Sequence, residues 1–346
     1  MKIARIKFLI IIICIITTIG FLLSGCTVST NDTDSIQSKE EPREITVYSG
    51  RQEKFIVPLV EKFEKDTGIK VNLISGKATE YAHRIIEENE NTQADVFLSN
   101  DGGILEYLRI ENMLAPIDSK LLDQVPANYI GKDKTWTALT IRYRIFMYNT
   151  DLITLDEVPD SIFDLTDPKY KGQFAINRAG NESMITYFAS IQSIIGPEKT
   201  LELMKGIMAN DPLVLQSHTD VRRAIGSGEV KFGLVNNYHY YTQLTEEGMN
   251  HVAMIFPDQA QGELGAFANI SGAAITKYAK HPNNALLFIE YLLQPEQQKM
   301  NDETPIIPGL EGIEYEAVRP ADTSLSEVGP LWEKTTDLME EAGYSD

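Results

Sequence analysis

Residues 44–75 read EITVYSGRQEKFIVPLVEKFEKDTGIKVNLIS and carry the pattern that decides the fold. The short β-rich run 45–48 is followed by residues 52–67, where apolar side chains recur at helical spacing and Gly68 is placed to end the helix. Residues 69–73 then alternate between apolar and polar side chains, as in a half-buried strand. A strand, a helix and a second strand of these lengths predict a parallel, doubly wound α/β sheet.

The same alternation continues along the chain and then starts again. Residues 79–88 predict a helix and residues 95–98 a third strand. A second set of elements follows, with strands at 174–176, 213–215 and 232–235 separated by helices at 183–195, 197–208 and 219–225. The sequence therefore predicts an α/β protein with two lobes, each built on a doubly wound sheet.

Polar loops follow the predicted strands in both sets. In the first set they are residues 49–52, 75–78 and 99–103, and in the second set 177–181, 216–220 and 236–239. Ligands bind at the carboxyl ends of the strands in open sheets of this kind. We therefore expect the two sets of loops to face each other across a cleft, as in a hinged binding protein whose closure buries a small ligand.

The N-terminus carries the pattern of a secretion signal. Lys2, Arg5 and Lys7 precede an apolar run that closes on LSGC, residues 23–26. This ending resembles the bacterial lipobox, which is cut before the cysteine, so Cys26 is the expected lipidated N-terminus. The apolar run is slightly short for a spanning helix, which needs about 20 apolar residues. An uncleaved membrane anchor is the alternative interpretation, and in both cases the rest of the chain works outside the cytoplasmic membrane.

Composition and motifs exclude several classes of function. Of the two cysteines, Cys14 lies in the segment to be removed and Cys26 is the one to be acylated, so no thiol remains for catalysis, a disulfide or a metal. Removal of three basic residues with the signal takes the formal charge from −19 to −22, which argues against nucleic acid as a partner. Nucleophile-elbow, zinc-protease, P-loop and dinucleotide motifs are missing from the sequence. We therefore expect a binding protein and not an enzyme, with no catalytic cofactor.

Six phrases carry a family resemblance that runs from Ile45 to about Tyr344. They are VYSGRQE, FEKDTGIKV, ADVFLSNDGG, LTDPKYKGQF, GSGEVKFGLVNNYHYY and ISGAAI. In their order and spacing they resemble the ferric-ion-binding proteins that serve iron ABC transporters. The resemblance implies a transferrin-like type II periplasmic-binding-protein fold, whose chain crosses between two lobes twice.

The resemblance also implies a domain organisation. The crossings fall near residues 140–144 and 269–273. The boundaries that follow are a signal peptide at 1–25, a lipid-anchored tether at 26–43, a first lobe at 44–141 and 269–319, and a second lobe at 142–268 and 320–346. The tether is rich in Ser, Thr, Asp, Glu and Lys, as flexible segments are.

By resemblance, the metal site centres on Tyr238. The family holds ferric iron with two adjacent tyrosines, and the matching pair here is Tyr238 and His239. The family's histidine corresponds to Gln52, its glutamate to Asn100 beside Asp101, and the extra tyrosine of its other branch to Ser183. A free tyrosine ionises near pH ~10, so the field of the metal has to keep the phenolate deprotonated at neutral pH.

Three ligands fit this changed pattern. Iron can bind through Tyr238, His239 and Asp101, with Tyr240 or Tyr241 substituting and an anion or water completing the shell. Another metal is the second possibility, since imidazole with one phenolate is softer than a phenolate pair. The third is an anionic organic molecule such as a sugar phosphate, held by backbone amides and arginines. The candidate anion-binding residues are Ser49, Gly50, Arg51, Arg142, Arg178, Gly180 and Asn181.

Several of these residues also have a structural interpretation. Asp101 is placed to cap the helix that follows it, and the tyrosines at 238, 240 and 241 could be packing residues. Arg142 and Arg144 could pair with acidic neighbours. The other histidines, His83, His218, His251 and His281, are interpreted as structural or solvated.

Together these observations predict the solute-binding receptor of an ABC importer. We expect it to be a monomer held by a lipid anchor on the extracytoplasmic face of the cell membrane. Its cargo is expected to be ferric iron, with a synergistic anion, and its partners an ABC permease and the cytoplasmic ATPase that drives it. Closure follows from the greater affinity of the ligand for the closed state.

Overall fold

The computed structural model describes residues 41–300, 304–305 and 318–344 of the 346. The predicted signal peptide, Cys26 and the tether up to residue 40 lie outside this part of the chain. The described residues belong to one compact unit that begins at Glu41. Within them, no helix has both the length and the apolar character needed to cross a membrane.

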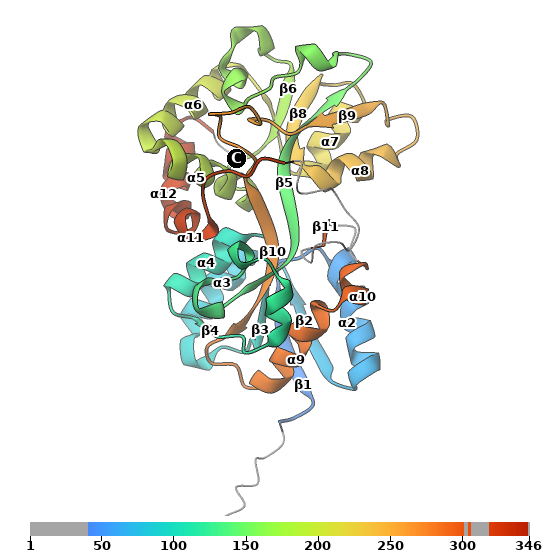
Figure 1. Cartoon of the computed structure of the whole chain (residues 1–346), viewed down its shortest axis with the longest axis vertical. Helices are drawn as coiled ribbons and strands as arrows, with labels where there is room; N and C mark the ends of the chain where they lie inside the picture. The colour runs from blue at the N-terminus through green and yellow to red at the C-terminus, as the bar shows by residue number, and fades with distance from the viewer. Residues whose placement is uncertain (1–40, 301–303, 306–317, 345–346) are drawn as a thin grey trace, which may run out of the picture. The chain divides into compact units, whose positions relative to one another are not determined.

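Strands and helices alternate through most of this unit (Figure 1). The strands are β1 (Glu44–Ser49), β2 (Lys70–Ser75), β3 (Val96–Ser99), β4 (Leu114–Ala115), β5 (Thr137–Asn149), β6 (Phe174–Asn177), β7 (Leu213–Leu215), β8 (Phe232–Asn236), β9 (Val252–Ile255), β10 (Ala268–Thr276) and β11 (Thr304–Pro305). The α-helices are α2 (Glu53–Thr67), α3 (Ala78–Glu88), α4 (Gly102–Ile110), α5 (Glu182–Ile195), α6 (Pro197–Ala209), α7 (His218–Gly226), α8 (Asn237–Leu244), α9 (Pro282–Leu292), α10 (Pro295–Gln298), α11 (Leu325–Val328) and α12 (Trp332–Glu341). Every strand and helix predicted from the sequence is present, with ends that agree within about two residues.

The strands follow the order β2-β1-β3-β10-β5-β8-β6-β7. β1 pairs in parallel with β2 and β3, and β6 pairs in parallel with β7 and β8, which confirms the predicted doubly wound arrangement in both sets. β10 and β5 run antiparallel to their neighbours. The sheet is therefore mixed, because two strands that the periodicity did not identify are inserted in its middle.

β5 joins the two sets of strands. Its first half pairs with β10, from Thr137 to Tyr143, and its second half pairs with β8 and β9, from Arg144 to Asn149. All 13 of its residues are buried. Figure 1 shows β5 and β10 side by side between the two groups of helices. The predicted crossings lie within these two strands, and the lobe boundaries themselves stay a prediction.

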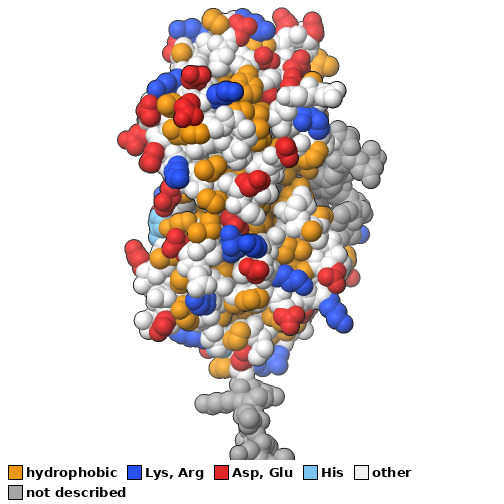
Figure 2. Space-filling view, turned by 60° about the vertical axis from the view of Figure 1, so that its left-hand side comes forward, with side chains coloured by type: hydrophobic (Ala, Val, Ile, Leu, Met, Phe, Trp, Pro, Cys, Tyr) orange, Lys and Arg blue, Asp and Glu red, His pale blue; other side chains and the backbone are white. Residues whose placement is uncertain are grey.

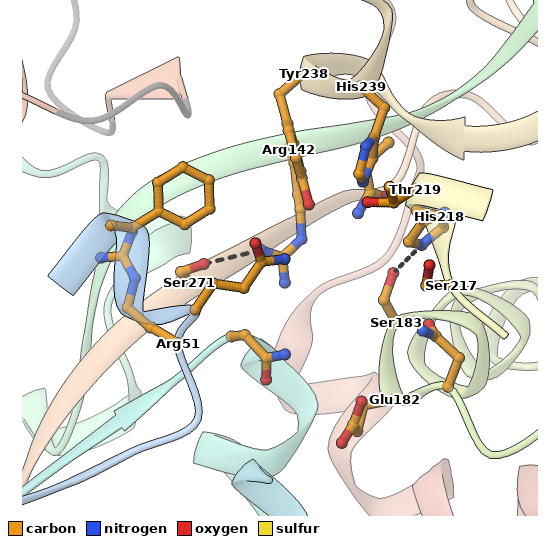
Figure 3. A pocket seen from close by; sticks show the side chains of 15 residues that line it. Arg51, Arg142, Glu182, Ser183, Ser217, His218, Thr219, Tyr238, His239 and Ser271 are labelled. Atoms are coloured by element: carbon orange, nitrogen blue, oxygen red, sulfur yellow. Dashed lines mark hydrogen bonds between the residues drawn. The ribbon is translucent and has the colours of Figure 1, made fainter. Parts of the chain in front are cut away.

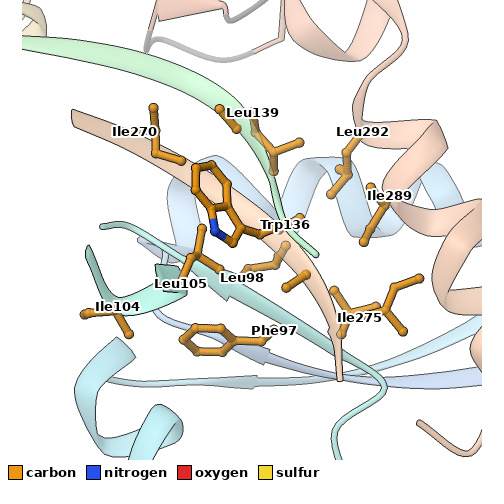
Figure 4. Packing of buried hydrophobic residues seen from close by; sticks show 14 of the residues in the cluster. Phe97, Leu98, Ile104, Leu105, Trp136, Leu139, Ile270, Ile275, Ile289 and Leu292 are labelled. Carbon is orange, nitrogen blue, oxygen red and sulfur yellow. The ribbon is translucent and has the colours of Figure 1, made fainter. Parts of the chain in front are cut away.

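Hydrophobic clusters fill the space between the sheet and its helices. Around β1, β3 and β10 the cluster includes Trp136, which is 1% exposed and packs among the residues shown in Figure 4. A second cluster lies beneath α5, α6 and α12, and a third beneath α7. Burying a large apolar side chain contributes about 1.5–3 kcal/mol, so these clusters hold the strand ends in fixed positions.

A local signal ends α2 where the sequence predicts. Gly68 ends α2 with a left-handed backbone at φ 71°, and its amide donates to the carbonyl of Glu64.

On the face seen in Figure 2, acidic and basic side chains are interspersed and form no large basic patch.

Candidate functional site

A pocket lies where the strand-end loops of both sets meet (Figure 3). It encloses about 610 Å³ of space, part of it open to solvent. Its lining comprises Arg51, Gln52, Phe55, Asn100, Arg142, Asn181, Glu182, Ser183, Ser217, His218, Thr219, Asn236, Tyr238, His239 and Ser271. The convergence expected of the two loop sets is therefore present, although the loop after β2 contributes no residue.

Two arginines give the pocket positive charge. Arg142 comes from β5, is 5% exposed, and donates to the hydroxyl of Ser271 at 2.8 Å and to the carbonyl of Ile270 at 3.2 Å. Arg51 follows β1, and its backbone amide donates to Oγ of Ser49 at 3.2 Å. The side-chain contacts hold the guanidinium group of Arg142 at the pocket, and Arg51 brings a second guanidinium to its lining, where such groups suit an anionic ligand.

Three aromatic rings form a stack on one side of the pocket. The ring of Tyr238 lies 4.2 Å from that of His239, and the ring of His239 lies 5.3 Å from that of His218. Phe55 from α2 meets Tyr238 edge-on at 6.5 Å. The stack places the phenol of Tyr238 toward the pocket, as Figure 3 shows.

Both histidines of the stack are neutral. Nε2 of His218 lies 2.8 Å from Nη1 of Arg144, and because arginine only donates, this nitrogen accepts. Burial, followed by the Arg144 charge, lowers the pKa of His218 well below its ordinary value. Burial, followed by the charge of Arg222, does the same to the pKa of His239. Nε2 of His239 is buried and has no hydrogen-bond partner within the described part of the chain.

Glu182, at the start of α5, is the single carboxylate among the described residues that line the pocket. Burial raises its pKa, and the nearby charge of Asp101 raises it further. The described residues contain no group of three or more His, Cys, Asp and Glu side chains arranged to hold a metal ion. A ferric ion in this pocket would therefore need ligand atoms from an accompanying anion as well as from Tyr238.

Asp101 lies outside the pocket lining and caps α4. Its Oδ1 accepts from the amide of Gly103 at 2.8 Å and from the hydroxyl of Thr186 at 2.7 Å, while Oδ2 accepts from the amide group of Asn269 at 2.7 Å. The side chain is 0% exposed, and burial raises its pKa. The capping interpretation is confirmed, and this carboxylate does not line the pocket.

Other predicted residues also lie apart from the lining. Tyr240 and Tyr241 stack on each other at 5.2 Å, and Tyr241 is 45% exposed. They miss the pocket because residues 237–244 form a helix, which sends successive side chains in different directions. The residues that the pocket does not include are Ser49, Gly50, Asp101, Arg178, Gly180, Tyr240 and Tyr241, whereas Arg51, Gln52, Asn100, Arg142, Asn181, Tyr238 and His239 are brought together.

His218 was interpreted from the sequence as structural or solvated, and the structure places it at the pocket as well as in a buried contact with Arg144. This residue lines the pocket, is 7% exposed and stacks on His239. The loop at 216–220 was identified as a strand-end loop, and that position was the one signal available for His218. Glu182 and Ser271 were missed for a similar reason, since nothing in their local sequence separates them from ordinary helix and strand residues.

Comparison with known proteins places the chain in a family. The family model for bacterial extracellular solute-binding proteins matches residues 58–324. The chain belongs to this family. Its members are solute receptors, which agrees with the expectation of a binding protein, and they work outside the cytoplasm.

Individual relatives of this solute-binding protein confirm the predicted resemblance to ferric-ion-binding proteins. Iron uptake protein A1 of Synechocystis is 32% identical over 360 residues, covering 99% of both chains. A Trichodesmium protein in complex with iron and citrate ligands is 30% identical, with a TM-score of 0.76, over 87% of this chain and 100% of that one. The iron-bound HitA of Pseudomonas aeruginosa is 25% identical, with a TM-score of 0.80, over 87% and 99% of the two chains. The predicted type II binding-protein fold is thereby confirmed.

Proposed function

We propose that this protein is the receptor of an ABC importer, that it captures ferric iron in the pocket, and that it hands the closed complex to a permease driven by a cytoplasmic ATPase. The observation that carries the proposal is the position of Tyr238, whose phenol enters the pocket at the start of α8. A phenolate is an anionic oxygen ligand that suits a hard cation. The names of the relatives, iron uptake and ferric binding, support the same cargo.

The iron is proposed to arrive with an anion. Arg51 and Arg142 line the pocket together with one carboxylate, and the histidines there are neutral. A bare ferric ion would meet more positive than negative charge from these side chains. A carboxylate-bearing chelator would supply the missing oxygen ligands to iron and pair with the guanidinium groups.

His239 sets this site apart from a pair of phenolates. In the predicted correspondence it replaces the second tyrosine, so one anionic ligand becomes a neutral nitrogen. That exchange removes one negative charge from the protein side of the complex. A more negatively charged anion on the iron would restore the balance, which is why we propose a polycarboxylate such as citrate as the companion.

The attachment of the receptor is proposed from the sequence. Cleavage before Cys26 and lipidation of that residue would hold the protein on the extracytoplasmic face of the membrane as a monomer. Labelling with radioactive palmitate, compared between the native chain and Cys26→Ser, tests this point. Label in the native chain alone supports the anchor, and label in neither contradicts it.

A second cargo is favoured by the arginines. A metal-free anionic organic molecule such as a sugar phosphate would pair with Arg51 and Arg142, and hydroxyl groups of the sugar could bond to Glu182 and His239. The specific observation for this candidate is the buried Nε2 of His239, which has no hydrogen-bond partner among the described residues. This nitrogen would bind a sugar hydroxyl as well as a metal ion.

Visible absorption distinguishes these cargoes. Titration of the full chain in a non-ionic detergent with ferric citrate should produce a phenolate-to-iron charge-transfer band that saturates at one equivalent. Tyr238→Phe should abolish the band, and Tyr241→Phe, which changes an exposed tyrosine outside the pocket, should leave it unchanged. Absence of the band in folded native protein would refute tyrosine-ligated iron. Binding of glucose 6-phosphate that depends on Arg142 would then support the second cargo.

A further inference from the structure

The first residue of α8 ties that helix to the central strand β5. The side chain of Asn237 is 0% exposed, and its Oδ1 accepts a hydrogen bond from the backbone amide of Tyr143 at 3.0 Å. The two residues are 94 apart in the chain, so this bond is a tertiary contact. It joins the helix that carries Tyr238 and His239 to the strand that runs through the middle of the sheet.

This bond continues the ladder between β5 and β8 beyond the end of β8. The pairing stops with Arg144 opposite Asn236, after which the chain turns into α8. In the same antiparallel register, the next pair would be Tyr143 and Asn237. The side-chain carbonyl of Asn237 replaces a backbone carbonyl there and gives the buried amide of Tyr143 its acceptor. Asn237 therefore fixes the point at which the chain leaves the sheet, one residue before Tyr238.

Little else fixes the start of α8. The side chain of the N-cap residue, Asn236, makes no capping hydrogen bond. All residues of α8 lie in the described part of the chain, and the three buried ones are polar: Asn237, His239 and Gln243. Gln243 holds the far end of the helix, where its Oε1 accepts from Arg222 at 2.6 Å. The start of the helix thus depends on the hydrogen bond of Asn237, because its buried face offers no apolar anchor.

The strand at the other end of this bond is firmly held. Tyr143 lies opposite Ala268 of β10, and its ring meets Phe256 edge-on at 5.9 Å. Every residue of β5 is buried. A hydrogen bond to this backbone amide therefore ties the start of α8 to a rigid part of the fold.

We propose that Asn237 is a positioning residue, which holds the phenol of Tyr238 in the orientation that enters the cargo pocket. Without the bond, the start of α8 can shift and the phenol occupies several orientations. The cargo then has to order the phenol before the two can bind, and that ordering reduces affinity. The consequence for iron rests on the function proposed above, whereas the effect on the position of Tyr238 does not.

Fluorine-19 NMR of the cargo-free full chain, labelled with 3-fluorotyrosine in a non-ionic detergent, tests the position of the phenol. The chain has 15 tyrosines, and the resonance of Tyr238 is the one missing from Tyr238→Phe. Asn237→Leu removes the acceptor but keeps the length and branching of the side chain. We expect one Tyr238 line in the native chain and a broadened or split line in Asn237→Leu. Asn237→Asp keeps the acceptor oxygen and should give one line.

Asn149→Leu is the matched control. Asn149 is a 5% exposed asparagine at the far end of β5 and does not line the pocket. Its side chain also bonds to the backbone, since it donates to the carbonyl of Ile225 and accepts from the amide of Asp151, both at 2.9 Å. This variant should keep the single Tyr238 line. If either leucine variant fails to fold, serine replaces leucine at both positions, with the same expected spectra.

Three results would overturn the proposal. They are a single Tyr238 line in Asn237→Leu, a split line in Asn237→Asp, and the same splitting in Asn149→Leu, which would indicate a general loosening of the fold.

Titration with ferric citrate separates this inference from the proposed cargo. Loss of one hydrogen bond should weaken binding about 5–10-fold in Asn237→Leu, and Asn149→Leu should bind as the native chain does. Native affinity in Asn237→Leu would overturn the positioning role. A native chain that gives no charge-transfer band would refute the iron cargo, and the fluorine spectra would still decide whether Asn237 positions Tyr238.

Discussion

The cap formed by Asp101 allows a quantitative prediction about a residue that the sequence also suggested as a metal ligand. Replacement by alanine removes the acceptor for the Gly103 amide. It also leaves two buried donors, the hydroxyl of Thr186 and the amide group of Asn269, without an acceptor. Loss of a helix cap costs about 1 kcal/mol. Each buried donor left without a partner costs about 1–3 kcal/mol.

Burial of the carboxylate offsets part of this loss. Because burial raises the pKa of Asp101, its charged form is destabilised in the fold, and the native interactions already compensate that cost. We therefore expect Asp101→Ala to lower the free energy of unfolding by about 3–5 kcal/mol. Asp101→Asn keeps the capping oxygen, but its NH2 group would face the NH2 group of Asn269, so that two donors meet. We expect this variant to lose about 1–3 kcal/mol of unfolding free energy. Rotation of Asn269 cannot relieve the conflict, because its oxygen accepts from the amides of Gly102 and Ile270.

Urea unfolding of the native chain and both variants measures these differences, and ferric citrate titration reports the site. Asp101→Asn should keep the charge-transfer band at one equivalent, because its side chain does not line the pocket. The reasoning is refuted if Asp101→Ala changes stability by less than about 1 kcal/mol while the folded variant loses the band. That combination would make Asp101 an iron ligand instead of a cap.

Two further predictions concern the pH dependence of stability and the close packing of the backbone at Gly50. The pKa values of His218 and His239 are lower in the folded chain than in the unfolded chain. Their contribution to stability is therefore present above pH ~6.5 and is lost as the pH falls below that value. The loss amounts to at most about 1.4 kcal/mol of unfolding free energy per pH unit for each histidine. Urea unfolding between about pH 7.5 and 5 should show a shallower decline in His218→Gln, and an unchanged slope would contradict the assignment. Gly50→Ala would place a Cβ 2.4 Å from Cβ of Ala78, so we expect a loss of about 1–3 kcal/mol in unfolding free energy and weaker cargo binding through displacement of Arg51. Native-like stability and affinity in this variant would contradict the prediction and show that the loop can move aside without loss of stability.

Strong periodicity made the outer strands and helices predictable from the sequence. The alternation in residues 44–75 places β1, α2 and β2 almost to the residue, because apolar side chains repeat with a single period in each element. β5 and β10 were harder to identify, since both faces of a central strand are buried and no alternation results. Arg142 and Arg144 add charges to β5, and these charges hide its burial from any reading of hydropathy.

The pocket was predictable as a set of loops but not as a set of side chains. Strand ends located the loops, since the carboxyl ends of parallel strands meet at one edge. Whether a side chain in such a loop turns inward depends on the start of the next helix. Asp101 turns back to cap α4, whereas His218 begins α7 and enters the pocket. The sequence neighbourhood of the two residues does not distinguish these outcomes.

The position of β10 in the sheet sets an order for folding. β3 precedes β10 by about 170 residues in the chain, yet the two strands pair directly, with Ser99 opposite Gly272. Contacts between such distant segments are slow to form, because a long loop has to close before any pairing is gained. Until residue 276 has emerged from the ribosome or the export channel, the apolar strand β3 has an unpaired edge that could join another chain. Newly made chains therefore depend on completion of synthesis, or on a chaperone that covers this edge, to avoid aggregation.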